Sequence, residues 1–407
     1  MEQRTSGHGT GATTEFERDV VELLLETVRT AAGQERDDIG TESLLSALVS
    51  GDSAAGAAIA PGRRAAGTLG GWIKSRETSV WVSDDAGDGT AGGPDDEREI
   101  DACWREVRQE EARRLRWKNR KRPEEERASL ELPPTTGALR TCLRNALAAA
   151  REEGTISVRV RHVARALVEL PDTRAREALV ARKLDVSAAS AALDALRGTD
   201  EPPEPGSVLV LRKAGTFGRS GNPLTRKVIA WMAGGGAGFG SAVVSVVRTE
   251  ARRSAVRRGA PEPRPVDVLL GILALDRSLR VAGRALPEDL AGANRGAEFL
   301  RRYGVRHDTV ARVLLPATGV AEGVPPESDG PTDFDQRLLH VTEFVAAATG
   351  SPTVGTTHLL AALLDETATD AESVAEIERV LAESGADVAG LRAEPELRVP
   401  RGAERSA

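Results

Sequence analysis

The chain has 407 residues, of which 40% are hydrophobic, and its 55 basic and 62 acidic side chains give a formal net charge of −7. This length predicts two or three domains with substantial cores, and the acidic balance argues against a chain-wide surface for nucleic acid or anionic membranes. The two cysteines are too few for a disulfide framework and no apolar run is long enough to span a bilayer, so we expect a cytoplasmic protein without a membrane segment.

A short module recurs four times along the chain. It consists of an amphipathic helix, a polar loop and an apolar helix in which a small residue precedes two aliphatic ones. The clearest copy of the apolar helix is Ile39–Val49, and three others align with it without gaps at 160–168, 265–273 and 356–364. The small positions are Ala47, Ala166, Gly271 and Ala362. Because a small side chain lets another helix backbone approach closely, the pattern predicts an all-α fold of packed helical repeats.

The four repeats divide the chain into two predicted helical domains. The first domain, 14–197, contains repeats at 14–61 and 135–197, which are separated by a charged insertion at 62–132. The second domain, 240–394, contains the third and fourth repeats. The other predicted boundaries are 199–239 for a linker, 240–316 and 331–394 for the last two repeats, and 1–13 and 395–407 for disordered tails.

Three segments outside the repeats have patterns of their own. Ser79–Val82 in the insertion and Val208–Leu211 in the linker are apolar runs that predict short strands. The acidic segment Asp84–Gly89 departs from the calcium-loop pattern, because alanine and a later aspartate stand where ligands are required. We therefore interpret this segment as a disordered loop and expect no metal site.

The insertion also carries one dense basic run, Arg113–Arg122, with a tryptophan inside it. Cations beside a stacking indole could bind nucleic acid, but acidic residues flank this run and neutralise it. Four of the five tryptophans fall in the insertion, and exposed aromatic side chains commonly anchor interfaces. The sequence thus predicts a partner-docking surface that includes Trp104, Arg113, Arg116 and Trp117. The alternative is that the tryptophans pack the insertion onto the first repeat.

The first repeat resembles the N-terminal repeat of the Clp family of AAA+ unfoldases. Phe16 matches the opening phenylalanine of that repeat, Gly40–Glu42 followed by two leucines matches its later signature, and His162 and His358 match its histidine. The resemblance is strong in the first and fourth repeats, moderate in the second and weak in the third. It implies two all-α domains, each a pseudo-twofold pair of repeats that recognises substrates or adaptor proteins.

Some domains of that family bind phosphorylated arginine. The resemblance implies that the opening threonine hydroxyl lies near the phosphate and the signature glutamate lies against the guanidinium. The first repeat keeps Glu42 but lacks the threonine, whereas the second keeps Thr136 but has Arg161 in place of the glutamate. If the pseudo-twofold axis pairs Thr136 with Glu42, a mixed site survives; otherwise Glu42 is a helix cap. Arg161 indicates either affinity for an acidic peptide or a solvated charge, and Thr332 and Thr357 take both positions in the fourth repeat.

The sequence lacks the motifs of the main enzyme classes. No lysine follows a glycine, which excludes a Walker A loop, and neither the zinc-protease pattern nor the Gly-x-Ser-x-Gly elbow occurs. The scattered histidines are interpreted as packed or capping residues. We therefore predict a non-catalytic protein without cofactor or metal that binds a protein or peptide, as an adaptor, scavenger or decoy for a Clp ATPase or its substrates. The alternatives are a nucleic-acid-associated regulator that uses residues 113–122 and an accessory protein of a Clp-associated peptidase.

Overall fold

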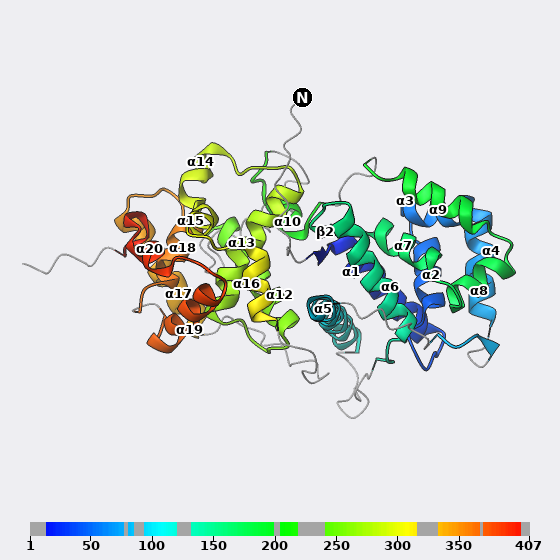
Figure 1. The fold of residues 1–407 in the computed structure, drawn as a ribbon. Helices are drawn as coiled ribbons and strands as arrows, with labels where there is room; N and C mark the ends of the chain where they lie inside the picture. The colour runs from blue at the N-terminus through cyan, green and yellow to red at the C-terminus, as the bar shows by residue number, and fades with distance from the viewer. Residues whose placement is uncertain are drawn as a thin grey trace, which may run out of the picture. The chain divides into compact units, whose positions relative to one another are not determined.

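The chain divides into two compact helical units, which are described separately below (Figure 1). The computed structural model describes residues 14–76, 80–84, 93–119, 132–198, 204–218, 241–315, 333–366 and 369–399. Unit 1 comprises the described residues 14–198, and unit 2 comprises the described residues 204–399. The predicted helical character is confirmed in both units. None of the described helices combines the length and the apolar character that crossing a membrane requires.

Unit 1 contains the first two repeats and most of the insertion. Its first half consists of β1 (Glu15–Phe16), α1 (Arg18–Gly33), α2 (Thr41–Ser50), α3 (Ala54–Ile59), α4 (Gly62–Ser75) and α5 (Pro94–Asn119). Its second half consists of α6 (Gly137–Glu152), β2 (Ser157–Val158), α7 (Val160–Glu169), α8 (Arg174–Ala181) and α9 (Val186–Ala195). Helix α6 begins where the sequence places a cap, because the Thr136 hydroxyl accepts a hydrogen bond from the Leu139 amide at 3.3 Å.

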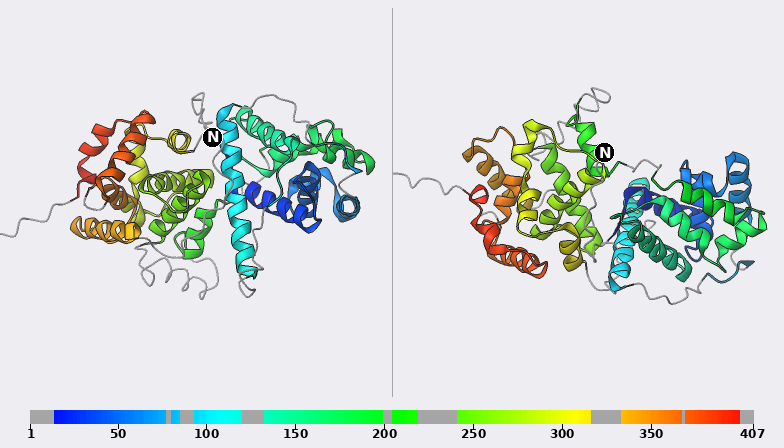
Figure 2. Two further views of the ribbon diagram at one scale, coloured as in Figure 1. Left: turned by 90° about the horizontal axis from the view of Figure 1, so that it is seen from below. Right: turned by 45° about the horizontal axis from the view of Figure 1, so that its top comes forward.

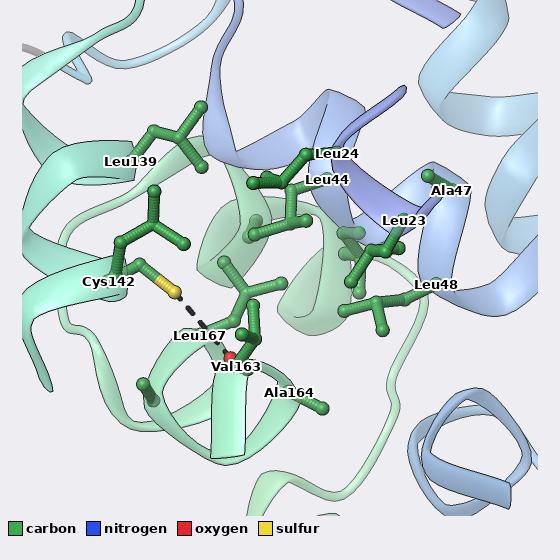
Figure 3. Packing of buried hydrophobic residues seen from close by; sticks show 14 of the residues in the cluster. Leu23, Leu24, Leu44, Ala47, Leu48, Leu139, Cys142, Val163, Ala164 and Leu167 are labelled. Atoms are coloured by element: carbon green, nitrogen blue, oxygen red, sulfur yellow. Dashed lines mark hydrogen bonds between the residues drawn. The ribbon is translucent and has the colours of Figure 1, made fainter. Parts of the chain in front are cut away.

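The two repeats of unit 1 share one core, shown in Figure 3. Leu24 and Leu44 from the first repeat face Leu139 and Val163 from the second, and all four are fully buried. Cys142 lies in the same core and donates its thiol proton to the Val163 carbonyl at 3.5 Å. Since each repeat alone would leave these side chains in water, the hydrophobic effect joins the two repeats into one unit.

Two short backbone pairings connect the repeats crosswise. Strand β1 pairs in parallel with β2, with Glu15 opposite Ser157, and Ile39 forms an isolated parallel bridge with Thr135. The segment before the first helix of each repeat thus lies beside the start of the apolar helix of the other repeat. This arrangement brings residues of both repeats together at the beginnings of α2 and α7.

The insertion contributes to the core of unit 1 instead of standing outside it. Helix α4 buries Leu69 and Ile73, and α5 buries Ile100 and Val107 at helical spacing. Figure 2 shows α5 in cyan as one long continuous helix. The strand predicted at 79–82 is not present in the part that the structure describes, residues 80–82.

Unit 2 contains the third and fourth repeats. Its first half consists of α10 (Gly206–Ala214), α12 (Ala242–Arg258), α13 (Pro265–Val281), α14 (Glu288–Ala291), the 3-10 turn η3 (Gly292–Asn294), α15 (Gly296–Arg302) and α16 (His307–Leu314). Its second half consists of α17 (Asp333–Ala348), α18 (Thr356–Leu363), α19 (Ala371–Glu383), α20 (Val388–Ala393) and η4 (Pro395–Leu397).

Two sequence predictions at the borders of unit 2 are wrong. Val208–Leu211, predicted as a strand in a linker, lies within helix α10, and Val208 and Leu211 are fully buried in the core of unit 2. A four-residue apolar run cannot by itself distinguish strand from buried helix. The described part of the predicted C-terminal tail also belongs to unit 2, because the Leu397 side chain is only 5% exposed.

The four small residues of the repeats are all buried, and at Gly271 the predicted close helix contact is confirmed. At Gly271 in α13, an added Cβ would lie 2.5 Å from the Val247 carbonyl oxygen of α12. The backbones of α12 and α13 therefore touch at a point where no side chain fits.

Candidate functional site

We call α2, α7, α13 and α18, the apolar helices of the four repeats, the signature helices. In three of them the side chain of the third residue caps the helix start. The Nδ1 atoms of His162 and His358 accept hydrogen bonds from the Arg159 and Gly355 amides at 2.9 and 3.1 Å. In α13, Asp267 accepts from the Arg264 amide at 2.8 Å. Burial lowers the pKa of both histidines, which keeps them neutral and suits an acceptor nitrogen. The interpretation of these two histidines as capping residues is confirmed.

The start of α2 surrounds a buried carboxylate. Asp84, from the insertion, is 1% exposed and accepts four hydrogen bonds. Its Oδ2 accepts from the Thr41 amide at 2.8 Å and the Thr136 hydroxyl at 2.9 Å. Its Oδ1 accepts from the Thr41 hydroxyl at 2.8 Å and the Arg174 amide at 3.1 Å. Three helix starts, those of α2, α6 and α8, thus converge on one anion, and hydrogen bonds to a charged acceptor are among the stronger kind.

Glu42 lies beside this carboxylate and faces a guanidinium group. The Glu42 side chain is fully buried, and its Oε2 lies 3.7 Å from Arg174 Nη1. Arg174 is also bound to Asp38 by two hydrogen bonds of 2.5 and 2.8 Å. Burial raises the pKa of Glu42, Arg174 lowers it, and nearby Asp84 raises it. We refer to Thr41, Glu42, Asp84, Thr136 and Arg174 as the Asp84 site.

The Asp84 site contains both halves of the predicted mixed pair. The Thr136 hydroxyl binds an anion, and Glu42 faces a guanidinium, which are the two roles that the resemblance implied. However, both groups come from the chain itself, because Asp84 is the anion and Arg174 carries the guanidinium. Sequence reasoning missed Asp84 because an acidic, glycine-rich segment is typical of a solvated loop.

The equivalent position in the second repeat is also filled internally. In α7 the first amide, of Val160, donates to Asp19 Oδ2 at 3.3 Å. Arg161, predicted as a contact for an acidic peptide or as a solvated charge, is neither. Its side chain is 11% exposed and forms ion-paired hydrogen bonds with both carboxylate oxygens of Glu153. The ion pair joins α7 to the end of α6, and the helical periodicity of the sequence does not predict a contact between these two positions.

In unit 2 the polar groups at the starts of the two signature helices have other partners. In α18 the first amide, of Thr356, donates to Asn294 Oδ1 at 2.9 Å, and the Thr357 hydroxyl accepts from the Arg295 amide at 2.9 Å. In α13 the first residue is Pro265, which has no amide proton. Thr357 therefore has an internal partner, and Thr332 lies outside the described residues.

Asp19 gives unit 1 a pH dependence that can be measured. Burial, with a smaller contribution from Glu17, raises its pKa from 3.8 to about 6. The unfolded chain loses this proton near pH 3.8 and the folded chain near pH 6, so this carboxyl lowers stability as pH rises between these values, by ~3 kcal/mol in total. Relative to the wild type, an Asp19→Asn variant should gain about 1–3 kcal/mol of stability as pH rises from 4 to 7, because asparagine carries no charge to bury.

Urea unfolding of both proteins across this pH range, followed by tryptophan fluorescence, tests the effect. Four of the five tryptophans lie in the sequence of unit 1, and Trp231→Phe in both proteins removes the fifth. If the stability difference between variant and wild type stays constant from pH 4 to pH 7, the ionisation of Asp19 does not cost unit 1 stability.

The predicted docking residues divide into buried and exposed members. Trp104 is only 4% exposed and packs in the core beside Cys103, so its assignment to a docking surface is wrong. Its position in phase with the other buried residues of α5 explains this. The alternative prediction is that the tryptophans pack the insertion onto the first repeat, and Trp104 packs in the core that both repeats share. Trp117 is 67% exposed, and Arg113 and Arg116 are exposed as well.

The basic run is partly neutralised within α5. Arg113 forms an ion pair with Glu110 at 2.6 Å, and Arg114 forms one with Glu111. The rest of the run, 120–122, lies outside the described residues. Among the described residues, no group of His, Cys, Asp and Glu side chains is arranged to hold a metal ion. No family model, no curated protein and no solved structure matches this chain.

Proposed function

We propose that the chain is a non-catalytic protein-binding protein and that Trp117 anchors its partner. The observation that supports this proposal is the exposure of a large aromatic side chain, 67% for Trp117, at the end of a helix whose earlier turns bury one face against the core. Tryptophan buries more surface per residue than most side chains, and it is enriched among the residues that dominate binding energy.

The charge around Trp117 favours an acidic partner segment. The last turn of α5 carries Arg116 and Lys118, and Arg113 lies one turn earlier with its side chain 56% exposed. Cations around an aromatic anchor increase the rate of association with an acidic segment and fix its orientation. Glu110 offsets one of these charges, so the indole, more than the charge, supplies affinity.

The first partners to test are a Clp-type unfoldase and its unfolded substrates, because the repeats resemble the recognition domain of that family. In this proposal the chain acts as an adaptor, a scavenger or a decoy, and a partner supplies any ATP-driven work. The polar groups at the signature helices support a passive role, since those described above are engaged in capping, ion pairs or buried hydrogen bonds.

Trp117→Ala should weaken binding of the partner by about tenfold or more. The measurement is equilibrium binding of the full chain to a purified Clp unfoldase and to unfolded casein. Val180→Ala is the matched control, because Val180 is 63% exposed on α8 of the same unit and should leave the affinity unchanged. Circular dichroism should show both variants folded, because neither side chain belongs to the core.

Two outcomes would count against this proposal. Absence of binding to both proteins removes the link to Clp-dependent proteolysis, and an equal effect of the two variants removes Trp117 as the anchor. Salt-sensitive retention on heparin that disappears when the cations of α5 are neutralised would instead support the nucleic-acid alternative.

A further inference from the structure

The arrangement of donors in the Asp84 site is that of an anion receptor. Four donors reach one carboxylate from residues far apart in the sequence: the Thr41 amide and hydroxyl, the Thr136 hydroxyl and the Arg174 amide, at 2.8 to 3.1 Å. Each carboxylate oxygen accepts two of these bonds. Two of the donors are amides at helix starts, where the helix dipole adds favourable potential for a negative charge.

The anion reaches this site from the surface of unit 1. Val82 is 44% exposed and Ser83 is exposed, whereas the next residue, Asp84, is 1% exposed. The carboxylate therefore projects from an exposed segment into the buried region where the two repeats meet. The backbone helps to hold it there, because the Asp84 carbonyl accepts a hydrogen bond from the Ala138 amide at 2.9 Å.

The other signature helices show that a helix start in this fold does not require a separate anion. The first amide of α18 is satisfied by the neutral Asn294 side chain, and α13 begins with Pro265. At α7 the first amide donates to Asp19, whereas α2 differs from all three other signature helices in that donors from three helix starts meet on its occupant.

A second observation at the site also points to a ligand. Glu42 is fully buried, and its Oε1 accepts a hydrogen bond from the Ser43 hydroxyl at 3.2 Å, yet its Oε2 accepts no hydrogen bond and has the ion pair with Arg174, at 3.7 Å, in its place. This oxygen lies over Gly40, where an added Cβ would approach it to 2.2 Å. An acceptor left without a donor inside a closed site is costly to bury, and it would suit a hydroxyl or N–H donor carried by a bound molecule.

We propose that the Asp84 site is an oxyanion-binding site that the chain fills with its own carboxylate. Its ligand class is a carboxylate or a phosphate group, and Asp84 is the built-in competitor that keeps such groups out. Because an attached carboxylate has a high effective concentration, free anions at millimolar concentration displace it little in the wild type. Removal of the Asp84 carboxylate should open the site.

The test is chemical rescue of Asp84→Ala by small anions. Thermal unfolding of unit 1 is followed by tryptophan fluorescence in the Trp231→Phe background, with sodium acetate, sodium phosphate or sodium chloride at matched ionic strength. We expect the variant to unfold at a lower temperature than the wild type in chloride. About 50 mM acetate or phosphate should raise its melting temperature by roughly 3–5 °C relative to chloride and leave the wild type within about 1 °C. Comparison of acetate with phosphate shows which oxyanion the site prefers.

Two further variants separate a specific site from a general effect of anions. Asp84→Asn keeps an oxygen acceptor and fills the same space, so we expect it to lose stability without responding to acetate or phosphate. Asp185→Ala removes the exposed cap of α9, whose carboxylate accepts from the Ala188 amide at 3.0 Å, and we expect no anion response there either. If Asp84→Ala does not fold in chloride, refolding in acetate or phosphate is measured by circular dichroism, and recovery of the fold is the expected result.

The proposal is overturned if Asp84→Ala responds to acetate and phosphate no more than the wild type or Asp185→Ala does. It is equally overturned if Asp84→Asn responds as strongly as Asp84→Ala, or if Asp84→Ala folds in none of the three salts.

Discussion

Replacement of Gly271 by valine should destabilise unit 2 by about 3 kcal/mol, the upper end of the usual cost of overpacking, because the added side chain has no space between two helix backbones. The first carbon alone would lie 2.5 Å from the Val247 carbonyl oxygen and 3.2 Å from the Ala251 amide nitrogen. Both neighbours are backbone atoms of α12, so α12 and α13 must separate, and this separation loosens the packing along their contact.

Urea unfolding measures this effect, with far-UV circular dichroism for the whole chain and tryptophan fluorescence for unit 1 in the Trp231→Phe background. The fluorescence transition should keep its midpoint, and the part of the circular dichroism change that belongs to unit 2 should move to lower urea. Gly292→Ala is the matched control: Gly292 has φ −58°, and nothing lies within 4 Å of an added Cβ. This control should be neutral or stabilising by about 0.5–1 kcal/mol. Equal midpoints for both variants would contradict the close helix contact.

Replacement of Arg174 by methionine should destabilise unit 1 by about 3–5 kcal/mol, because it leaves Glu42 without its buried counterion. Arg174 is 6% exposed, and its guanidinium joins Asp38 to Glu42. Methionine keeps most of the apolar stem, and the Arg174 amide that binds Asp84 remains in place. The loss therefore comes mainly from the uncompensated carboxylates.

The pH dependence identifies this cause. Burial already raises the pKa of Glu42, and removal of Arg174 raises it further, so the folded variant holds this proton to higher pH than the unfolded chain does. The variant should consequently lose stability relative to the wild type as pH rises from about 5 to 8. In a double-mutant cycle, Glu42→Gln should restore a large part of the loss in the Arg174→Met background and have a smaller effect alone. A pH-independent loss that Glu42→Gln does not reduce would show that packing, and not charge, is the role of Arg174.

The features that the sequence predicted correctly are those set by local patterns. Gly271 and the three aligned alanines stand at a fixed place in the apolar helices, so the burial of all four and the close contact at Gly271 follow from helical periodicity. His162 and His358 stand three residues after a helix cap, which is the spacing of a capping interaction. The burial of Trp104 could also have been predicted from the sequence, because Ile100, Cys103, Trp104 and Val107 form one helical face.

The features that the sequence did not reveal depend on contacts between distant residues. Asp84 meets Thr41, Thr136 and Arg174, which lie 43, 52 and 90 residues away. Nothing in the acidic segment around Asp84 distinguishes a buried carboxylate from a solvated one. The partner of Arg161 was also not predictable. Glu153 stands at the end of α6, and the conformation of the segment between α6 and α7 decides whether the two side chains meet.

The crosswise pairing of the repeats has a consequence for how unit 1 folds. Its interior is complete only when both repeats are present, and the contacts that close it join residues as distant as Glu17 and Ser157, 140 positions apart. A chain that must lose so much loop entropy before its long-range contacts form reaches the native state slowly for a helical protein. Unit 1 should accordingly emerge from synthesis with its first repeat incomplete and acquire its stability in one late, cooperative step.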